Sequence, residues 1–232
     1  MPGHDDFTSS QSAEAIANYF SSISQEYAPL SLSTLPPRVR QHLLKHDTST
    51  MPHLSIASVK SRIVKAKKPM STVPGDLPKK IVKMCADELA VPAKIMYEKV
   101  IKTGEYPVKW KTEHQIAIPK CDDPKDESEL RNIAKTAFLS KVFESFLFEW
   151  ILSYIKPYLD PDQCGVKGSS IVHYLIKFLN FVHQNLNSRK PQAVIATCID
   201  LSKAFNRVDH SIVITDLFDM NTPSWLLKII CS

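Results

Sequence analysis

The sequence predicts an α+β fold in which helices surround one β-hairpin and a single buried strand comes near the end. Apolar residues recur with a helical spacing in several long segments. Two short segments, 114–119 and 131–138, have the pattern of paired strands. The uninterrupted apolar run 193–199 has the length of a buried strand. This order of elements is typical of α+β proteins.

The helices follow from apolar spacing and from residues that start or stop a helix. Ser55 is a suitable N-cap for one of them, and Gly104 is a natural residue just past the end of another. Pro157 ends a long helix that is rich in Phe and Leu. The expected helices are 14–27, 38–45, 54–66, one that begins after Pro78, 92–102, 139–155, 169–186, 208–219 and 223–231. Residues 1–13 are polar, and we expect them to be disordered.

The strands are expected where apolar residues alternate or run without interruption. Ile116 and Ile118 alternate in the first strand of the hairpin, and an acidic loop, 121–129, leads to the second. The buried strand 193–199 is followed directly by Asp200. A carboxylate in such a place is costly to bury unless it is paired or binds a cation. Taken alone, an Asp that caps the next turn is the simpler interpretation.

The composition excludes several classes of function. The chain has five glycines, of which only Gly165 and Gly168 are close together. Dinucleotide-binding loops, Walker A loops and kinase glycine loops need closely spaced glycines, so none of these is expected. The five cysteines form no CxxC pair, which argues against a zinc knuckle or a disulfide framework. We expect reduced thiols in the nucleus or cytoplasm, and no apolar run approaches a membrane span.

The net charge of +5 is unevenly distributed. The segment 38–83 carries eleven Lys and Arg against Asp47 and Asp76. Such a basic block favours contact with a phosphate backbone. A solvated linker with a basic bias explains the charge equally well.

A set of short motifs resembles the reverse transcriptases of non-LTR retrotransposons, the long interspersed elements of the jockey and chicken-repeat type. The segment 198–210, Cys-Ile-Asp-Leu-Ser-Lys-Ala-Phe-Asn-Arg-Val-Asp-His, resembles the first catalytic motif of that family. Further matches follow the family's order over residues 60–232. They are Pro74-Gly75-Asp76-Leu77-Pro78, Tyr106-Pro107-Val108-Lys109-Trp110-Lys111, Ile118-Pro119-Lys120, Leu130-Arg131-Asn132-Ile133-Ala134, Lys141-Val142-Phe143-Glu144, Gln163-Cys164-Gly165 and Gly168-Ser169-Ser170.

The resemblance implies the fingers and the beginning of the palm of a right-hand polymerase, incomplete in this chain. Residues 1–50 are then an N-terminal linker, partly disordered and partly helical. Residues 51–190 are a fingers-like region, and 191–232 begin the palm. The expected partners are an RNA template, a DNA primer and deoxynucleotide triphosphates, with no membrane.

The resemblance also implies roles for individual residues. Asp200 is the matched catalytic ligand of Mg²⁺, and the backbone carbonyl of Leu201 is a second metal contact. Phe205 matches the ring that packs under the incoming sugar and collides with a 2′-hydroxyl. Lys120 and Arg131 match the residues that hold the triphosphate. Gln163 and Gly165 match a template or active-site wall.

Simpler interpretations remain open for two of these residues. Phe205 could be a core aromatic residue, and Arg131 could pair with the acidic loop of the hairpin. The family's second catalytic motif, an aromatic-x-Asp-Asp segment, does not occur after Asp200. One of three expected carboxylates is therefore present, and we expect this chain alone to be inactive. The alternatives are a non-catalytic nucleic-acid-binding remnant and a decayed open reading frame.

Overall fold

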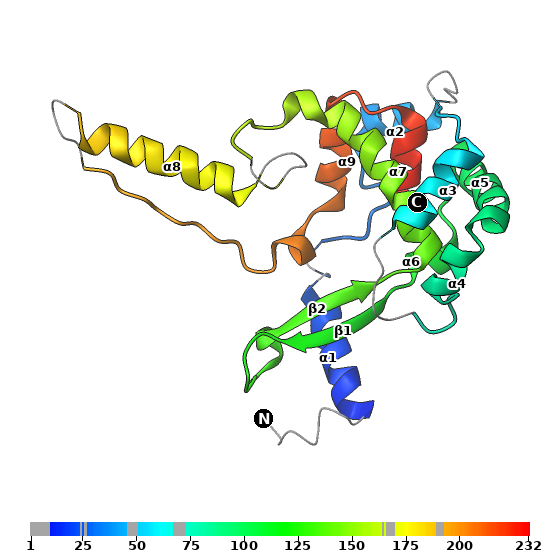
Figure 1. The fold of residues 1–232 in the computed structure, drawn as a ribbon, viewed down its shortest axis with the longest axis horizontal. Coiled ribbons are helices and arrows are strands. Elements are labelled where there is room, and N and C mark those ends of the chain that lie inside the picture. The colour runs from blue at the N-terminus through cyan, green and yellow to red at the C-terminus, as the bar shows by residue number, and fades with distance from the viewer. Residues whose placement is uncertain are drawn as a thin grey trace. The chain divides into compact units, whose positions relative to one another are not determined.

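A computed structural model describes residues 10–23, 25, 27–45, 51–66, 73–163, 165, 170–188 and 193–232 (Figure 1). Its contacts divide the chain into two compact units. The first unit comprises Met1–Tyr154 and Phe205–Ser232, and the second comprises Ile155–Ala204. The disorder expected for 1–13 falls largely on 1–9, outside the described residues. The functional boundaries at 50 and 190 stay predictions, because a division by contacts does not test them.

The first unit is built mainly from helices, and their positions follow the apolar spacing of the sequence. They are α1 (Ser10–Ile23), α2 (Pro37–Leu44), α3 (Ile56–Lys65), α4 (Lys79–Met84), α5 (Ala86–Thr103), α6 (Val108–Lys111), α7 (Phe138–Ile155), α9 (His210–Asp219) and α10 (Ser224–Cys231). Ser55 is the N-cap of α3, and its side chain accepts a hydrogen bond from the Ser58 backbone N–H at 3.1 Å. Helix α5 begins six residues before Pro92. The negative charges of Asp87 and Glu88 in its first turn stabilise this end, because they interact favourably with the helix dipole.

Aromatic side chains form the centre of the first unit's core. Phe143 on α7 is fully buried and stacks on Tyr97 of α5, with ring centroids 4.9 Å apart. The Tyr97 hydroxyl donates to the backbone carbonyl of Leu139 at 2.9 Å. Burial raises the pKa of Tyr97, so the phenol stays neutral and keeps this hydrogen bond. Trp110 of α6 packs beside the same rings. Helices α5, α6 and α7 are thereby joined around one cluster.

Gly104 allows the end of α5 to lie against α10. Its φ of +72° is a left-handed conformation that favours glycine. A Cβ atom built on it would lie 2.7 Å from Cβ of Lys228 on α10. The expectation that Gly104 terminates the helix is confirmed. The close approach adds a tertiary reason for the same residue.

The expected hairpin is present as a two-stranded antiparallel sheet (Figure 1). Strand β1 spans His114–Pro119 and β2 spans Leu130–Lys135, with Ile118 opposite Arg131. The loop between them contains the short 3₁₀ helix η2 (Glu127–Glu129). The α+β class is therefore confirmed as a mostly helical fold with one small sheet.

The second unit lacks a packed core among its described residues. It contains a 3₁₀ turn, η3 (Lys156–Tyr158), and helix α8 (Ile171–Leu186), and η4 (Ala204–Arg207) spans its boundary with the first unit. None of its described residues is buried. The buried strand expected over 193–199 is wrong, because this segment is irregular and almost wholly exposed. A strand needs a neighbour to complete its backbone hydrogen bonds, and no described segment pairs with this one.

Candidate functional site

The hairpin presents Lys120 and Arg131 on one face. Arg131 lies opposite Ile118, and the Lys120 backbone N–H donates to the carbonyl of Glu129 at 2.8 Å, which continues the ladder past β1. Residues two apart on a strand share a face, so Lys120 is the diagonal neighbour of Arg131. Both side chains are exposed. The hairpin therefore offers two cations side by side to a ligand in solution.

The acidic loop of the hairpin uses its carboxylates locally. Asp126 accepts a hydrogen bond from the Ser128 backbone N–H at 2.7 Å, and Glu129 accepts one from that of Lys125. Among the described residues, Arg131 has neither an ion pair nor a hydrogen bond to its side chain. The alternative in which Arg131 pairs with this loop is therefore not observed. Lys120 is partly engaged, because its ammonium donates to the Ser128 carbonyl at 2.6 Å.

The residues matched to the catalytic motif lie in exposed, irregular chain. Asp200 is exposed, and Leu201 is 72% exposed. Phe205, in η4, is 97% exposed, so the alternative of a core aromatic residue is not observed. Asp200 and Leu201 belong to the second unit, whereas Lys120 and Arg131 belong to the first. The structure thus brings together the two cations of the hairpin and does not bring Asp200 into the same unit.

The Gln-x-Gly segment is described only in part. The Gln163 side-chain carbonyl accepts a hydrogen bond from the Gly165 backbone N–H at 3.4 Å. Cys164, Gly168 and Ser169 lie outside the described residues. Gln163 and Gly165 are therefore tied to each other, with no further geometry that bears on a template.

The described residues do not by themselves fit a centre for two metal ions. In the described part of the chain, no three His, Cys, Asp or Glu side chains gather into a metal-binding group. Asp200 brings one carboxylate and Leu201 one backbone carbonyl. A pair of Mg²⁺ ions needs more oxygen ligands than these, even when waters complete the shell.

Much of the basic block 38–83 is used inside the fold. Arg38 pairs with Asp219 of α9 at 2.9 Å, and Lys60 pairs with Asp87 of α5. The ammonium of Lys83 donates to the carbonyls of Val64 and Ala66 at the end of α3. These contacts favour a structural role for part of the block. Lys67 and Lys68 lie outside the described residues.

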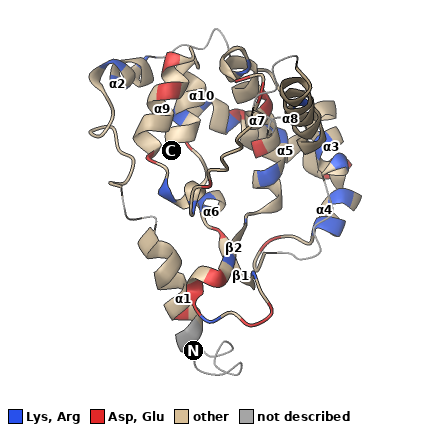
Figure 2. Ribbon diagram, turned by 90° about the vertical axis from the view of Figure 1, so that its left-hand side faces the viewer, with Lys and Arg blue, Asp and Glu red and all other residues tan. Residues whose placement is uncertain are grey.

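A basic cleft of about 710 Å³ lies between α3, the start of α4 and α7. We define the basic cleft by its lining residues, Ser58, Ser61, Arg62, Lys65, Ala66, Lys79, Phe138, Lys141, Val142, Ser145 and Glu149. Its volume is in the range of pockets that bind small molecules. In Figure 2, positions of Lys and Arg recur along α3 and α4. Four cations and one carboxylate line the cleft, together with three serines.

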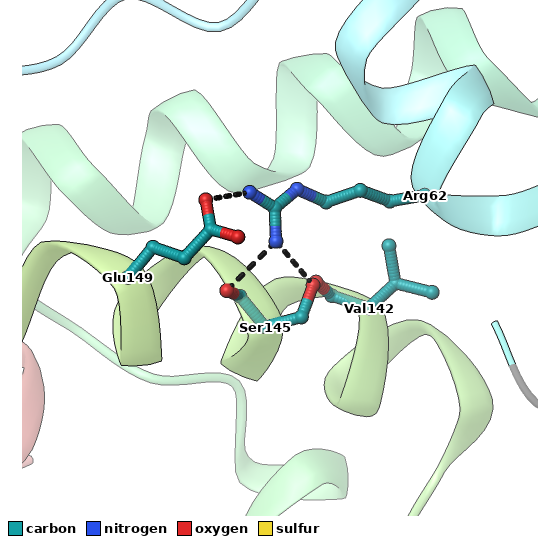
Figure 3. Close-up of polar contacts among 4 residues, drawn as sticks. All are labelled: Arg62, Val142, Ser145 and Glu149. Carbon is teal, nitrogen blue, oxygen red and sulfur yellow. Dashed lines mark hydrogen bonds and ion pairs between the residues drawn. The ribbon is translucent and has the colours of Figure 1, made fainter. Parts of the chain in front are cut away.

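Arg62 fixes the wall of the basic cleft (Figure 3). One nitrogen of its guanidinium donates to the backbone carbonyl and the hydroxyl of Ser145, at 2.8 and 2.9 Å. The other pairs with the carboxylate of Glu149. The guanidinium also lies over the ring of Phe146, 3.8 Å from its centroid. The positive charge of Arg62 is thus balanced by Glu149, the one acidic residue in the lining of the cleft.

The remaining three cations of the basic cleft have no such partner. Within the described residues, Lys65, Lys79 and Lys141 make neither an ion pair nor a side-chain hydrogen bond. Lys65 and Lys141 are exposed, whereas Lys79 is only 7% exposed. Burial first, and then the charge of Lys141, lower the pKa of Lys79. The cleft therefore holds a positive charge that its own residues do not balance.

Asp76 links the floor of the basic cleft to α7. Its carboxylate accepts a hydrogen bond from the Phe138 backbone N–H at 2.8 Å, at the start of α7, and another from Leu77 at 2.9 Å. This negative charge favours the charged form of Lys79, but it forms no ion pair with that residue. The Pro-Gly-Asp segment thus anchors α7 and places Lys79 beside Phe138, whose ring centroid is 5.8 Å from the ammonium.

Sequence reasoning did not find the basic cleft. The segment Lys141 to Glu144 contained a partial indication. Residues two apart on a helix point to different sides, and here Lys141 lines the cleft while Phe143 is buried in the core. Glu144 instead accepts a hydrogen bond from the hydroxyl of Ser140 at 2.7 Å. No sequence pattern, however, indicates that Lys79 and Lys141 line the same cavity.

Comparison with known protein families adds no identification. A search of protein-family models finds none that matches this chain. Across the described residues, none of the helices has the length and apolar character needed to cross a bilayer.

Proposed function

We propose that this chain is a reverse-transcriptase-like protein of the non-LTR retrotransposon type and that its hairpin binds the triphosphate of an incoming deoxynucleotide. The proposal rests on the ordered motifs of the sequence. The single structural observation that supports it is the exposed pair Lys120 and Arg131 on one face of the hairpin. Arg131 has an unengaged guanidinium among the described residues, and a planar fork of donors suits phosphate oxygens.

The chain acts in this proposal as a nucleotide- and template-binding part rather than as a complete catalyst. Asp200 and Leu201 contribute to a Mg²⁺ site that needs further carboxylates. Phe205, exposed in the free chain, is the residue that packs under the sugar. We expect the purified chain to extend no DNA primer on an RNA template in Mg²⁺. Extension that depends on Asp200 would contradict this expectation.

Nucleotide binding is the direct test. The affinity of the chain for a deoxynucleotide triphosphate is measured by calorimetry for the unaltered chain and for Arg131→Ala and Lys120→Ala. We expect each substitution to weaken binding about tenfold, because a charge-assisted contact to phosphate contributes on the order of 1.5–3 kcal/mol. Arg131→Ala should have the larger effect, since Lys120 also donates to Ser128.

Lys125→Ala is the matched control for this test. Lys125 is exposed on the loop of the same hairpin, and its substitution removes the same charge. Only its backbone N–H, which the substitution keeps, contacts Glu129. Equal affinities for Lys125→Ala and Arg131→Ala would mean that the loss of binding comes only from the lower net charge, and would count against the hairpin site.

A second candidate is a nucleic-acid-binding protein without chemistry. The observation that favours it is the unbalanced charge of Lys65, Lys79 and Lys141 in the basic cleft. It predicts salt-sensitive binding of RNA or DNA that survives Asp200→Ala. It also predicts loss of binding when Lys65, Lys67 and Lys68 are neutralised together. Equal affinity of that triple variant would contradict it.

A further inference from the structure

We propose that the basic cleft between α3, α4 and α7 is a phosphate-binding site, separate from the hairpin, in which Lys79 and Lys141 hold the phosphate oxygens. The site does not depend on the reverse-transcriptase proposal, because none of its lining residues belongs to the hairpin or to the catalytic motif. The phosphate can belong to a nucleotide or to the backbone of a single strand. Both present the same oxygens to the same lysines.

Lys79 is the residue that points to a ligand. The residue is only 7% exposed, and its ammonium reaches the cavity, where it has no hydrogen-bond or ion-pair partner among the described residues. Partial loss of water around an unpaired cation is costly, and an ion-pair partner offsets that cost. The carboxylate of Asp76, whose charge favours the charged form of Lys79, accepts hydrogen bonds from two backbone N–H groups instead. An anion in the cleft would supply the missing partner.

The rest of the lining suits the same ligand. Lys141 is close enough to Lys79 to lower its pKa, so an anion placed between the two ammonium groups would relieve their repulsion. Ser61 on α3 brings a hydroxyl donor to the cleft, whereas the Ser58 hydroxyl already donates to the Ser55 carbonyl at 2.8 Å. The carboxylate of Glu149 is held by Arg62, so its repulsion of an anion is offset.

The size of the basic cleft allows more than an inorganic ion. About 710 Å³ accommodates a mononucleotide, although Phe138 and Val142 in its lining are almost fully buried and offer little surface of their own. The lysines are therefore the main contacts that the cleft offers to a phosphorylated ligand. The probes are therefore inorganic pyrophosphate, a mononucleotide and a ten-residue oligo(dT).

The test measures the affinity for each probe in the unaltered chain and in Lys79→Met and Lys141→Gln. We expect both substitutions to weaken binding of at least one probe by about tenfold. If the oligonucleotide is the tighter ligand, each substitution should also lower the slope of log affinity against log salt by about 0.7. Tighter binding of the mononucleotide would instead identify a small phosphorylated ligand.

Lys80→Gln is the matched control. Lys80 follows Lys79 on α4 but is exposed and does not line the cleft. The same measurements are repeated with Lys79→Met and Lys141→Gln in the Arg131→Ala background, which disables the proposed hairpin site, so that the remaining phosphate binding reports the cleft. If Lys79→Met is poorly folded, Lys141→Gln decides, since Lys141 is exposed and its removal leaves the core intact. Failure of all three probes to bind, or equal losses in Lys80→Gln and Lys141→Gln, would overturn the proposal.

A second readout follows the ammonium itself. Reductive methylation with ¹³C-labelled formaldehyde gives each lysine an NMR signal whose pH titration reports its pKa. Pyrophosphate should raise the pKa of Lys79, because an anion stabilises the charged form. An unchanged titration of Lys79 at saturating pyrophosphate would contradict the assignment of this residue.

Discussion

The two units of this chain contain similar apolar side chains but use them in opposite ways. In the first unit, Tyr97 and Phe143 are fully buried in a core shared by helices that are distant in the sequence. In the second, helix α8 exposes eight large apolar side chains, Ile171, Val172, Tyr174, Leu175, Ile176, Leu179, Phe181 and Leu186. Apolar content therefore does not make a core by itself. A second apolar surface must face the first before either leaves water.

The irregular segment 193–201 shows the same rule for the backbone. Ile195 and Ile199 are 88% and 86% exposed, although most of the residues in the run 193–199 are apolar. Helix α8 satisfies its own backbone hydrogen bonds, so it forms without a partner. An isolated extended segment cannot do this and stays solvated.

The largest expected effect is in amide hydrogen exchange. Residues 193–201 lie in no hydrogen-bonded ladder, so their amides should exchange at the shortest labelling times. Amides of α5 and α7 should exchange slower by several orders of magnitude, because they open only with the core. Mass spectrometry of peptides from both regions measures the difference. Protection of 193–201 similar to that of α5 would mean that this segment has found a strand partner.

Removal of one aromatic ring from each unit gives the next effect. Phe143→Ala should lower the free energy of unfolding by about 3–5 kcal/mol, because it leaves a cavity among buried rings. Phe181→Ala, on a ring that is 58% exposed, should change it by less than about 0.5 kcal/mol. Urea unfolding followed by tryptophan fluorescence is a suitable measurement, since Trp110 and Trp225 are both buried in the core. Similar losses in the two variants would show that α8 is packed in solution.

Two glycines test whether α10 belongs to the same cooperative core. Gly75 and Gly104 both have φ near +75°, at +78° and +72°. Gly75→Ala should cost about 1–2 kcal/mol from backbone strain alone, because nothing lies within 4 Å of its new Cβ. Gly104→Ala should cost about 1–3 kcal/mol more, because its Cβ would overlap Lys228 of α10. The comparison uses the same urea measurement, and equal costs would argue that α10 separates from α5 without penalty.

The smallest effect compares two helix caps. Ser55 caps α3 in the first unit, and Ser170 caps α8 in the second. Ser55→Ala should lower the free energy of unfolding by about 1 kcal/mol. Ser170→Ala should leave the fluorescence transition unchanged and lower only the helical circular dichroism signal. A shift of the urea unfolding transition in Ser170→Ala would indicate that the two units unfold together as one cooperative block.

Local patterns in the sequence were enough to predict most of the elements. The cap at Ser55, the glycine at the end of α5 and the first strand of the hairpin, with its alternating Ile116 and Ile118, all depend on residues close in the chain. Such features follow from backbone geometry and from side chains one turn apart, so the sequence contains them directly. The reverse-transcriptase interpretation also came from ordered motifs, and it stays a proposal.

Features that join distant residues could not be predicted. In the sequence, Arg62 belongs to a basic block that favours phosphate contact. In the fold, its guanidinium pairs with Glu149, 87 residues away. Lys79 reads as an ordinary surface lysine, and burial against α7 turns it into the unbalanced charge of the basic cleft. The run 193–199 reads as a buried strand, and the lack of a neighbour among the described residues leaves it exposed.

The sequence by itself determined most of the helices and the hairpin, because these elements depend on spacing, caps and breakers within a few residues, whereas the strand expected over 193–199 did not form. Only the tertiary structure decided which of these elements became buried and which charges stayed unpaired. The physical reason is that burial and ion pairing are properties of two surfaces in contact. In this chain, those surfaces come from segments dozens of residues apart.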